Sequence, residues 1–252
     1  MKLQELEKEL SDKLNLNLFS ASDKSLNGVQ VGDLEQEITK IALLVDASME
    51  GFKQAKKIGA NLIIVHHGFF WGSPLAIKGT HYHRVKFLIE NNIALYAAHL
   101  PLDAHLELGN NAGIAKLLDL KDIEPFGQYR GNLIGIKGKL KNQITLNEVK
   151  NRIVGQGEPA YIIPGGKPKI STIAIISGGA PHSVNEAIAE NIDLFITGDI
   201  SHEVYHTCIE EKINMISAGH YATEIHGVKQ VGEWIKSTFD IDSIFIDIPT
   251  GA

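Results

Sequence analysis

Apolar and polar positions follow a helical period at the start of the chain and then a repeating strand–helix pattern. Leu3, Leu6, Leu10 and Leu14 recur on one stripe of residues 1–15, which predicts an amphipathic helix. The later apolar runs predicted as strands are 41–45, 62–65, 93–98, 173–176, 194–197, 215–218 and 244–248. The stretches predicted as helices between them are 50–58, 83–90, 112–118, 183–190, 201–211 and 228–238. This alternation indicates an α/β protein whose sheets are covered on both faces.

The middle of the chain interrupts this pattern. Residues 126–170 are richer in Gly and Pro, and a hairpin is predicted around 132–140. The strand–helix alternation resumes after this stretch, which suggests that two similar halves flank it.

The two halves share a strand–helix–strand spacing. The segments 41–48 (IALLVDAS) and 173–180 (IAIISGGA) are both strand-to-turn stretches, and Ala42 and Ala174 lie 132 positions apart (174 − 42). The same offset aligns the helix and the strand that follow, without a gap. Since any two βαβ units resemble each other, this spacing alone leaves chance similarity open.

A second offset aligns the polar segments that follow the third strand of each half. His220 lies 121 positions after His99 (220 − 99), and Glu224 then falls opposite Asp103. The smaller offset implies a longer loop in the first half. We therefore predict two similar three-layer α/β/α domains from an internal duplication, over residues 1–125 and 126–252. The last strand, 243–249, can pair with either half.

Two adjacent histidines end the predicted strand 62–65. Ligands in open α/β sheets bind beyond the carboxyl ends of strands, where His66 and His67 lie. Neighbouring strand residues point to opposite faces, and Gly68 lets the backbone turn, so the two rings can reach two neighbouring positions. A pair of surface or core histidines is the alternative.

A second polar cluster follows the predicted strand 93–98. It contains His99, Asp103 and His105, and Pro101 predicts a loop rather than a helical turn. Carboxylate oxygen and imidazole nitrogen together suit Zn²⁺, Mn²⁺ or Fe²⁺. Alternatively, Asp103 stabilises the turn or caps the next helix.

A third cluster, with His220, Glu224 and His226, follows strand 215–218 and is the counterpart of the second. A pseudo-twofold axis between the halves would bring the two loops face to face. The metal site is then predicted in the cleft between the domains. Its expected ligands, drawn from both halves, are His66, His67, Asp103, His220 and Glu224.

Five protein ligands exceed the three that a catalytic zinc usually takes with a water. Two divalent transition-metal ions, whether zinc, iron or manganese, use this number naturally. His99, His105 and His226 are then candidates for orienting the ligands or shuttling protons.

Other polar residues give weaker signals. His202-Glu-Val-Tyr-His206 matches the HExxH spacing of mononuclear zinc hydrolases, although no third ligand is evident downstream. Asp199, opposite His67 in the repeat, can reach the site or can simply begin a helix. His81, His83 and Arg84 can contact an anionic substrate or can be solvated.

Composition and charge narrow the class of protein. The chain has 44% hydrophobic and 21% charged residues, as globular domains do, and a net charge of −6. That charge gives no basic field for nucleic acid or anionic lipid. One cysteine, Cys208, excludes an internal disulfide framework, and we expect it to be buried in a helix. No signal peptide or membrane span is apparent, so we expect a soluble cytoplasmic protein.

Four segments together resemble a known family. The segments VHHGFFW (65–71), HLPLDAHLELGNN (99–111), GHYATE (219–224) and NGVQVG (27–32) are similar to those of the NGG-interacting-factor-like dinuclear metal-centre proteins. Many members are named GTP cyclohydrolase I type 2 homologues. The resemblance covers essentially the whole chain, and the chain is similar to the short form, without the large central insertion of some members.

The resemblance implies a two-domain α/β fold with both metals between the halves. By matching position, it places the metal ligands on His66, His67, Asp103, His220 and Glu224. It also implies a metal-dependent hydrolase, a small-molecule substrate with GTP as a candidate, and homo-oligomeric rings, often hexamers. Since no triphosphate clamp is evident, a non-catalytic protein for metal delivery or regulation remains an alternative.

Overall fold

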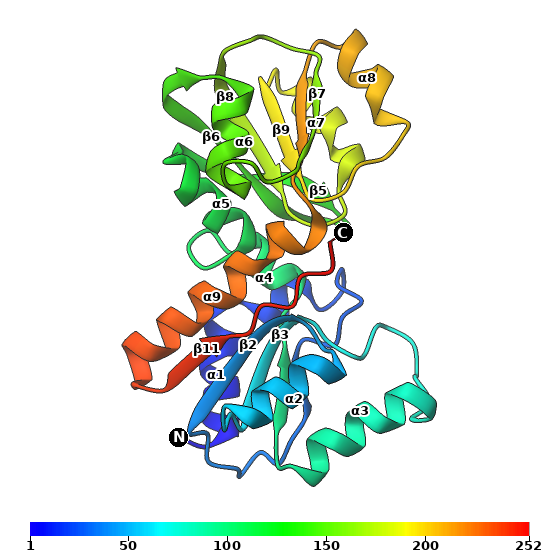
Figure 1. Ribbon diagram of the computed structural model, residues 1–252, viewed down its shortest axis with the longest axis vertical. Helices are drawn as coiled ribbons and strands as arrows, with labels where there is room; N and C mark the ends of the chain where they lie inside the picture. The colour runs from blue at the N-terminus through cyan, green and yellow to red at the C-terminus, as the bar shows by residue number, and fades with distance from the viewer. Residues whose placement is uncertain (252) are drawn as a thin grey trace. The chain divides into compact units, whose positions relative to one another are not determined.

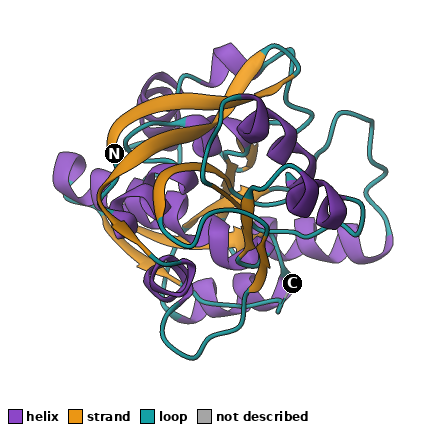
Figure 2. Cartoon of the chain, turned by 90° about the horizontal axis from the view of Figure 1, so that it is seen from above, coloured by secondary structure: helices purple, strands orange, loops and turns teal. Residues whose placement is uncertain are grey.

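The computed structural model describes residues 1–251 and separates into two compact units. The first contains Met1–Leu102 and Gly227–Ile248, and the second contains Asp103–His226 and the residues from Pro249 onward. Each unit has its own β-sheet with helices packed against it, so the protein has a two-domain α/β fold (Figure 1). Figure 2 distinguishes the helices from the strands by colour. Among residues 1–251, no helix is long and apolar enough to cross a membrane.

The first unit is built on a five-stranded sheet. Its strand order is β1-β4-β3-β2-β11, parallel except for β1 at one edge. The strands are β1 (Gly28–Val31), β2 (Lys40–Asp46), β3 (Leu62–His67), β4 (Ala94–Ala97) and β11 (Asp242–Phe245). The helices are α1 (Leu3–Lys13), the 3-10 helix η1 (Leu16–Phe19), α2 (Met49–Lys57), α3 (Gly79–Glu90) and most of α9 (His220–Phe239).

Helices cover both faces of this sheet. Successive strand residues point to opposite sides, so each side contributes its own set of buried residues. On one face Ala42 and Leu44 share a core with Phe52 of α2 and Leu88 of α3. On the other face Leu43 lies so close to α9 that a Cβ on Gly232 would come 2.3 Å from its Cδ1. The first unit therefore has three layers, as predicted for each domain.

The second unit contains a six-stranded mixed sheet of order β5-β6-β8-β9-β10-β7. The strands are β5 (Lys121–Tyr129), β6 (Asn132–Ile144), β7 (Tyr161–Pro164), β8 (Ile170–Ile176), β9 (Leu194–Thr197) and β10 (Asn214–Ser217). The helices are α5 (Asn110–Leu118), α6 (Leu146–Val154), the 3-10 helix η2 (Pro181–Ser183), α7 (Val184–Ala189) and α8 (Val204–Glu210). Isoleucines of the central strands pack with Ile114 and Leu118 of α5 and Val149 of α6.

Four strands of each sheet share one topology. In the first unit the antiparallel strand β1 flanks the parallel strands β4, β3 and β2, and in the second β7 flanks β10, β9 and β8. The register is also shared: Ala42 pairs with Ile63, and Ala174 pairs with Phe195, each 132 positions later. Equal registers in both copies support an internal duplication.

The middle of the chain is more regular than its sequence pattern indicates. The predicted hairpin around 132–140 is instead one long strand, β6, which pairs with β5 across a turn at Arg130 and Gly131. Both turn residues have positive φ, 47° and 90°. The exposed residues of β5 mask the alternation that identifies a strand, so the prediction missed it.

Two helices carry the chain across the boundary between the units. One is the short helix α4 (Leu100–Ala104), and the other is α9, which begins at His220. The prediction of a loop at Pro101 was wrong, because this proline is the second residue of α4, where the missing N–H costs no helical hydrogen bond.

The end of the chain returns to the first sheet. Strand β11 pairs in parallel with β2, with Ile244 opposite Ala42. The predicted domain boundary between residues 125 and 126 falls inside strand β5, whereas the compact units divide the chain between Leu102 and Asp103 and again after His226.

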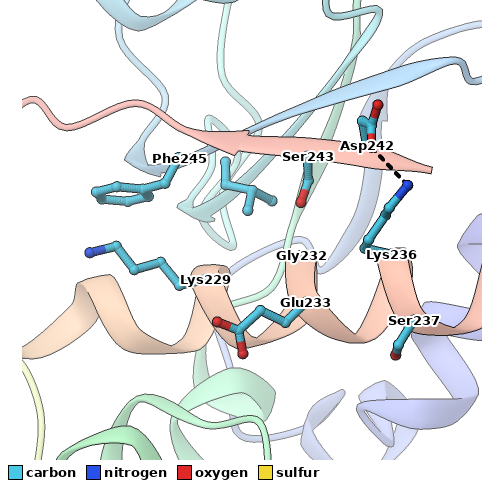
Figure 3. A pocket seen from close by; sticks show the side chains of 9 residues that line it. Lys229, Gly232, Glu233, Lys236, Ser237, Asp242, Ser243 and Phe245 are labelled. Carbon is cyan, nitrogen blue, oxygen red and sulfur yellow. Dashed lines mark ion pairs between the residues drawn. The ribbon is translucent and has the colours of Figure 1, made fainter. Parts of the chain in front are cut away.

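A cavity of about 490 Å³ lies between α9 and β11 in the first unit (Figure 3). Lys236 closes one end through an ion pair with Asp242 at 2.9 Å, and Lys229 lies 4.2 Å from the centre of the Phe245 ring. The cavity contains no histidine, so it is separate from the candidate metal ligands.

Replacing Phe52 with Ala should destabilise the first unit by about 3–5 kcal/mol, since its fully buried ring packs edge-on against Phe69 at 5.6 Å. Urea unfolding followed by tryptophan emission measures this unit selectively, because Trp71 and Trp234 both belong to it. The control Phe52→Leu, which keeps most of the buried volume, should lose less. Equal losses would contradict the packing argument.

Candidate functional site

Three histidines of the first unit come together where strands β3 and β4 end. The ring centroids of His66 and His67 are 4.6 Å apart, and His99 lies 5.0 Å from His66 and 5.7 Å from His67. One ring nitrogen of each lies within 4.8 Å of the others, so the three can hold a metal ion. We call this group the histidine cluster.

Each ring of the histidine cluster is oriented by a hydrogen bond at Nδ1. His66 Nδ1 lies 3.0 Å from the Ala98 carbonyl, which can only accept, so the ring must donate there. His67 and His99 pair at Nδ1 with carboxylates, Asp46 at 2.8 Å and Asp23 at 2.9 Å. Such partners select the tautomer that offers Nε2 to a metal.

Asp23 connects the His99 ring to its surrounding loops. Besides the ring, its carboxylate accepts from the backbone N–H groups of Ser25 and Leu100 and from the Asn27 side chain. Burial opposes ionisation of this carboxyl, but the hydrogen bonds from His99 and the other donors outweigh it and lower its pKa. Asp23 is therefore an ionised partner for His99.

The segment Asn27–Gly32 supports the turns after β3 and β4. Asn27 Oδ1 accepts from the His99 backbone N–H at 2.8 Å, and Gln30 Oε1 accepts from the Phe69 N–H at 2.7 Å. Gly68 is needed there, because an added Cβ would lie 2.4 Å from Gln30 Nε2 and 2.7 Å from Ala97 Cβ. These hydrogen bonds position the histidines, and no residue of the segment is itself a candidate ligand.

A second set of donors lies in the second unit, and we call it the carboxylate cluster: Asp103, His220 and Glu224. His220 and Glu224 are four residues apart on the first turns of α9, and His220 Nε2 lies 3.2 Å from Glu224 Oε1. A carboxylate oxygen of Asp103 lies within 4.8 Å of one of Glu224. Two carboxylates and an imidazole are a donor set that suits divalent transition metals.

Asp103 is held by neighbours in its own unit. Ser177 Oγ and Asn110 Nδ2 both donate to Asp103 Oδ1 at 2.9 Å, and Asn111 Nδ2 donates to the Asp103 backbone carbonyl at 3.1 Å. These contacts fix the carboxylate of Asp103 although it lies on a helix of only five residues.

A glycine turn lies against His220 and Glu224. Gly178 has φ of +63°, and a Cβ there would lie 2.2 Å from Glu224 Oε1 and 3.2 Å from His220 Nε2. A Cβ on Gly179 would lie 2.9 Å from Asp199 Oδ2. The two glycines therefore leave space beside these side chains that the Cβ of any other residue would occupy.

Charge compensation in the carboxylate cluster centres on Glu224, which is only 3% exposed. The His220 ring donates hydrogen bonds to Glu224 and, from Nδ1, to Asp199 at 3.0 Å, and these raise the pKa of His220 to about 9 despite partial burial. Without a metal ion, the imidazolium supplies the positive charge that a buried carboxylate requires.

The remaining predicted residues lie outside both clusters. His105 Nδ1 accepts from the backbone N–H groups of Glu107 and Leu108, each at 3.1 Å, so it stabilises the turn before α5. His226 lies two residues after Glu224 on α9 and belongs to no donor group found among residues 1–251. Asp199 orients the His220 ring.

The HExxH interpretation is not supported. Helix α8 begins at Val204, so His202 and Glu203 precede it, and His202 and His206 are both exposed. Neither is part of a donor group of three within the described residues. Cys208 is buried in α8 as expected, and burial raises the pKa of its thiol to about 11.

Comparison with known proteins identifies the family. The model of the Duf34/NIF3 (NGG1p interacting factor 3) family matches residues 1–251. The chain belongs to the Duf34/NIF3 family. The family expected from the sequence resemblance is thereby confirmed.

Relatives of this Duf34/NIF3 chain span its full length. An Archaeoglobus fulgidus protein named GTP cyclohydrolase 1 type 2 homolog is 41% identical over 250 residues, covering 99% of both chains. A Deinococcus radiodurans protein of the same name is 41% identical over 248 residues, covering 98% of this chain and 93% of its own. The crystal structure of TTHA1606 from Thermus thermophilus is 35% identical, with a TM-score of 0.90 and full coverage of both chains.

Replacing Gly178 with Ala should lower zinc affinity at least about tenfold, since the new methyl group would displace the Glu224 carboxylate. Gly59→Ala is the matched control, because Gly59 also has positive φ, +76°, but has nothing within 4 Å of the added Cβ. Metal titration of both variants separates crowding of Glu224 from backbone strain. Equal affinity loss in the two variants would count against the role of the turn.

The metal-free protein should lose stability as the pH rises from about 6.5 to about 9. The folded-state pKa of His220, about 9, exceeds its ordinary value of 6.5, so its stabilisation is complete below 6.5 and is lost as pH passes 9. Calorimetric melting of the chelated protein should show the difference from His220→Gln shrinking over this range. A difference that is constant with pH would contradict the assignment.

Proposed function

We propose that the protein is a dinuclear-metal-dependent hydrolase of the cyclohydrolase type. The proposed ligands of two divalent transition-metal ions are His66, His67, Asp103, His220 and Glu224. The observation that carries the proposal is the shared orientation of the imidazoles. His66, His67 and His99 are all engaged at Nδ1, which leaves Nε2 as the donor atom of each.

Covalent connection supports a joint role for the two clusters. His99 of the histidine cluster precedes α4, and Asp103 of the carboxylate cluster lies on that helix, four residues later. Four residues span at most about 14 Å even when fully extended. The chain itself therefore ties a donor of one cluster to a donor of the other.

The residues also fit the chemistry that hydrolysis needs. Bound divalent ions lower the pKa of a coordinated water toward 7 and polarise the group that is attacked. The Asp46 and Asp23 carboxylates hold His67 and His99 in the donor tautomer. With Asp23 ionised beside it, His99 can accept a proton from the attacking water and return it to the leaving group.

The names of the relatives suggest a substrate. Proteins 41% identical to this chain are named GTP cyclohydrolase 1 type 2 homolog. In that reaction water adds at C8 of the guanine ring and formate leaves. We therefore propose a nucleotide or a similar heterocycle as the substrate.

A non-catalytic role in metal delivery or regulation is the second candidate, and it would use the same ligands. The titration of His220 favours it, because a ligand that exchanges a proton for a metal makes uptake and release depend on pH.

We also propose that the protein is cytoplasmic and forms a homo-oligomer, in the form of a hexameric ring.

The purified protein should carry close to two equivalents of transition metal per chain under metal-replete conditions. Glu224→Gln should remove at least about one equivalent, because it takes away a buried carboxylate donor. The control His202→Ala changes an exposed histidine outside both clusters and should keep the wild-type metal content. Less than one equivalent in the wild type, or a greater loss in His202→Ala, would sink the dinuclear proposal.

Activity then separates the two candidates. The metal-loaded protein should release formate from GTP, and Glu224→Gln should release at least about a hundredfold less. Two bound ions without formate release, across zinc, iron and manganese, would leave the delivery role ahead.

A further inference from the structure

Trp71 is a large aromatic residue that lies beside the histidine cluster. It ends the run Phe69-Phe70-Trp71, in which Phe69 is buried and Phe70 packs against the same core. Trp71 instead remains 39% exposed. This partly exposed indole lies next to candidate metal ligands, where a bound molecule can contact it.

The loop at Ser25 and Leu26 holds the backbone of Phe70 and Trp71 in place. Trp71 forms an isolated antiparallel bridge with Ser25, and the Phe70 carbonyl accepts from the Leu26 N–H at 2.9 Å. The same loop contains Asp23, which orients His99. The loop that positions a candidate ligand therefore also positions Trp71.

The indole ring itself is fixed against the histidines. Its Nε1–H donates to the Gly68 carbonyl at 3.0 Å, so its only polar atom is satisfied within the loop. The ring centroid lies 4.8 Å from that of His99 and 6.0 Å from that of His67. With this N–H engaged, the rest of the indole is apolar ring, and it lies beside the histidine cluster.

We propose that Trp71 is a stacking platform that selects a planar heterocycle as the substrate at the histidine cluster. This inference rests on the proposed function and deepens it, because it assigns the residue that recognises the flat ring, whereas a metal centre by itself can also hydrolyse esters. A flat aromatic base gains stacking energy on an indole, whereas a non-aromatic ester does not. Trp71 thus acts on substrate binding and takes no part in holding metal.

Emission from Trp71 provides a direct test. The chain has two tryptophans, so Trp234→Phe makes Trp71 the single emitter. In this metal-loaded variant guanosine should quench the emission, and inorganic triphosphate, which lacks a base, should not. The matched control Trp71→Phe leaves Trp234 as the emitter and should give no response to either probe.

Affinity gives a second, independent readout. Trp71→Leu should bind guanosine about tenfold to a hundredfold more weakly with unchanged metal content, and Trp71→Tyr should restore most of the affinity. If formate release is measurable, the Leu variant should raise the KM for GTP more than it lowers kcat. If Trp71 only supported the histidines, Trp71→Leu would lower the metal content instead.

Failure of this inference can be distinguished from failure of the proposed function. A metal-loaded protein whose Trp71 emission ignores guanosine, or whose Leu variant binds guanosine as tightly as the wild type, overturns the stacking role alone. A protein that takes up less than one metal equivalent overturns the dinuclear centre. The guanosine titration still decides the stacking role in that case, because quenching reports on the indole itself.

Discussion

Hydrogen bonds at Nδ1 control the chemistry of the candidate metal ligands. The Nδ1 atom of each ring in the histidine cluster is hydrogen-bonded to an acceptor, and Nδ1 of His220 is hydrogen-bonded to Asp199 in the same way. Without these partners a histidine can rotate or expose the wrong nitrogen, and metal affinity typically falls tenfold to a hundredfold. The acidic partners of the histidines therefore matter nearly as much as the ligands.

The duplication explains how similar halves supply different donors. The second strand of the first copy ends in His66 and His67, and the equivalent positions in the second copy, 132 later, are Gly198 and Asp199. In the second copy the imidazole lies on α9 instead, and Asp199 supports it. The first unit thus pairs His67 with Asp46 and His99 with Asp23, whereas the second unit pairs a histidine of α9 with Asp199.

Sequence patterns predicted the strands next to the candidate ligands accurately, but they predicted the segments after those strands less well. His66 and His67 were expected at a strand end and are the last residues of β3. His220 was expected in a loop, but α9 already begins there and places Glu224 one turn further along the same face. The pattern that identifies α9 consists of its apolar residues, and polar donors in its first turn hide where the helix starts.

The sequence alone determined the α/β class, the duplicated strand–helix pattern, the family and the candidate metal donors, because these depend on local periodicity and on short motifs. Only the tertiary structure revealed that Asp23 and Asp46 orient His99 and His67, since these pairs lie 76 and 21 residues apart. It also decided that Gly178 leaves space for Glu224 and that β11 joins the first sheet. A single carboxylate or glycine gives no periodic signal, and its role appears only when distant segments pack together.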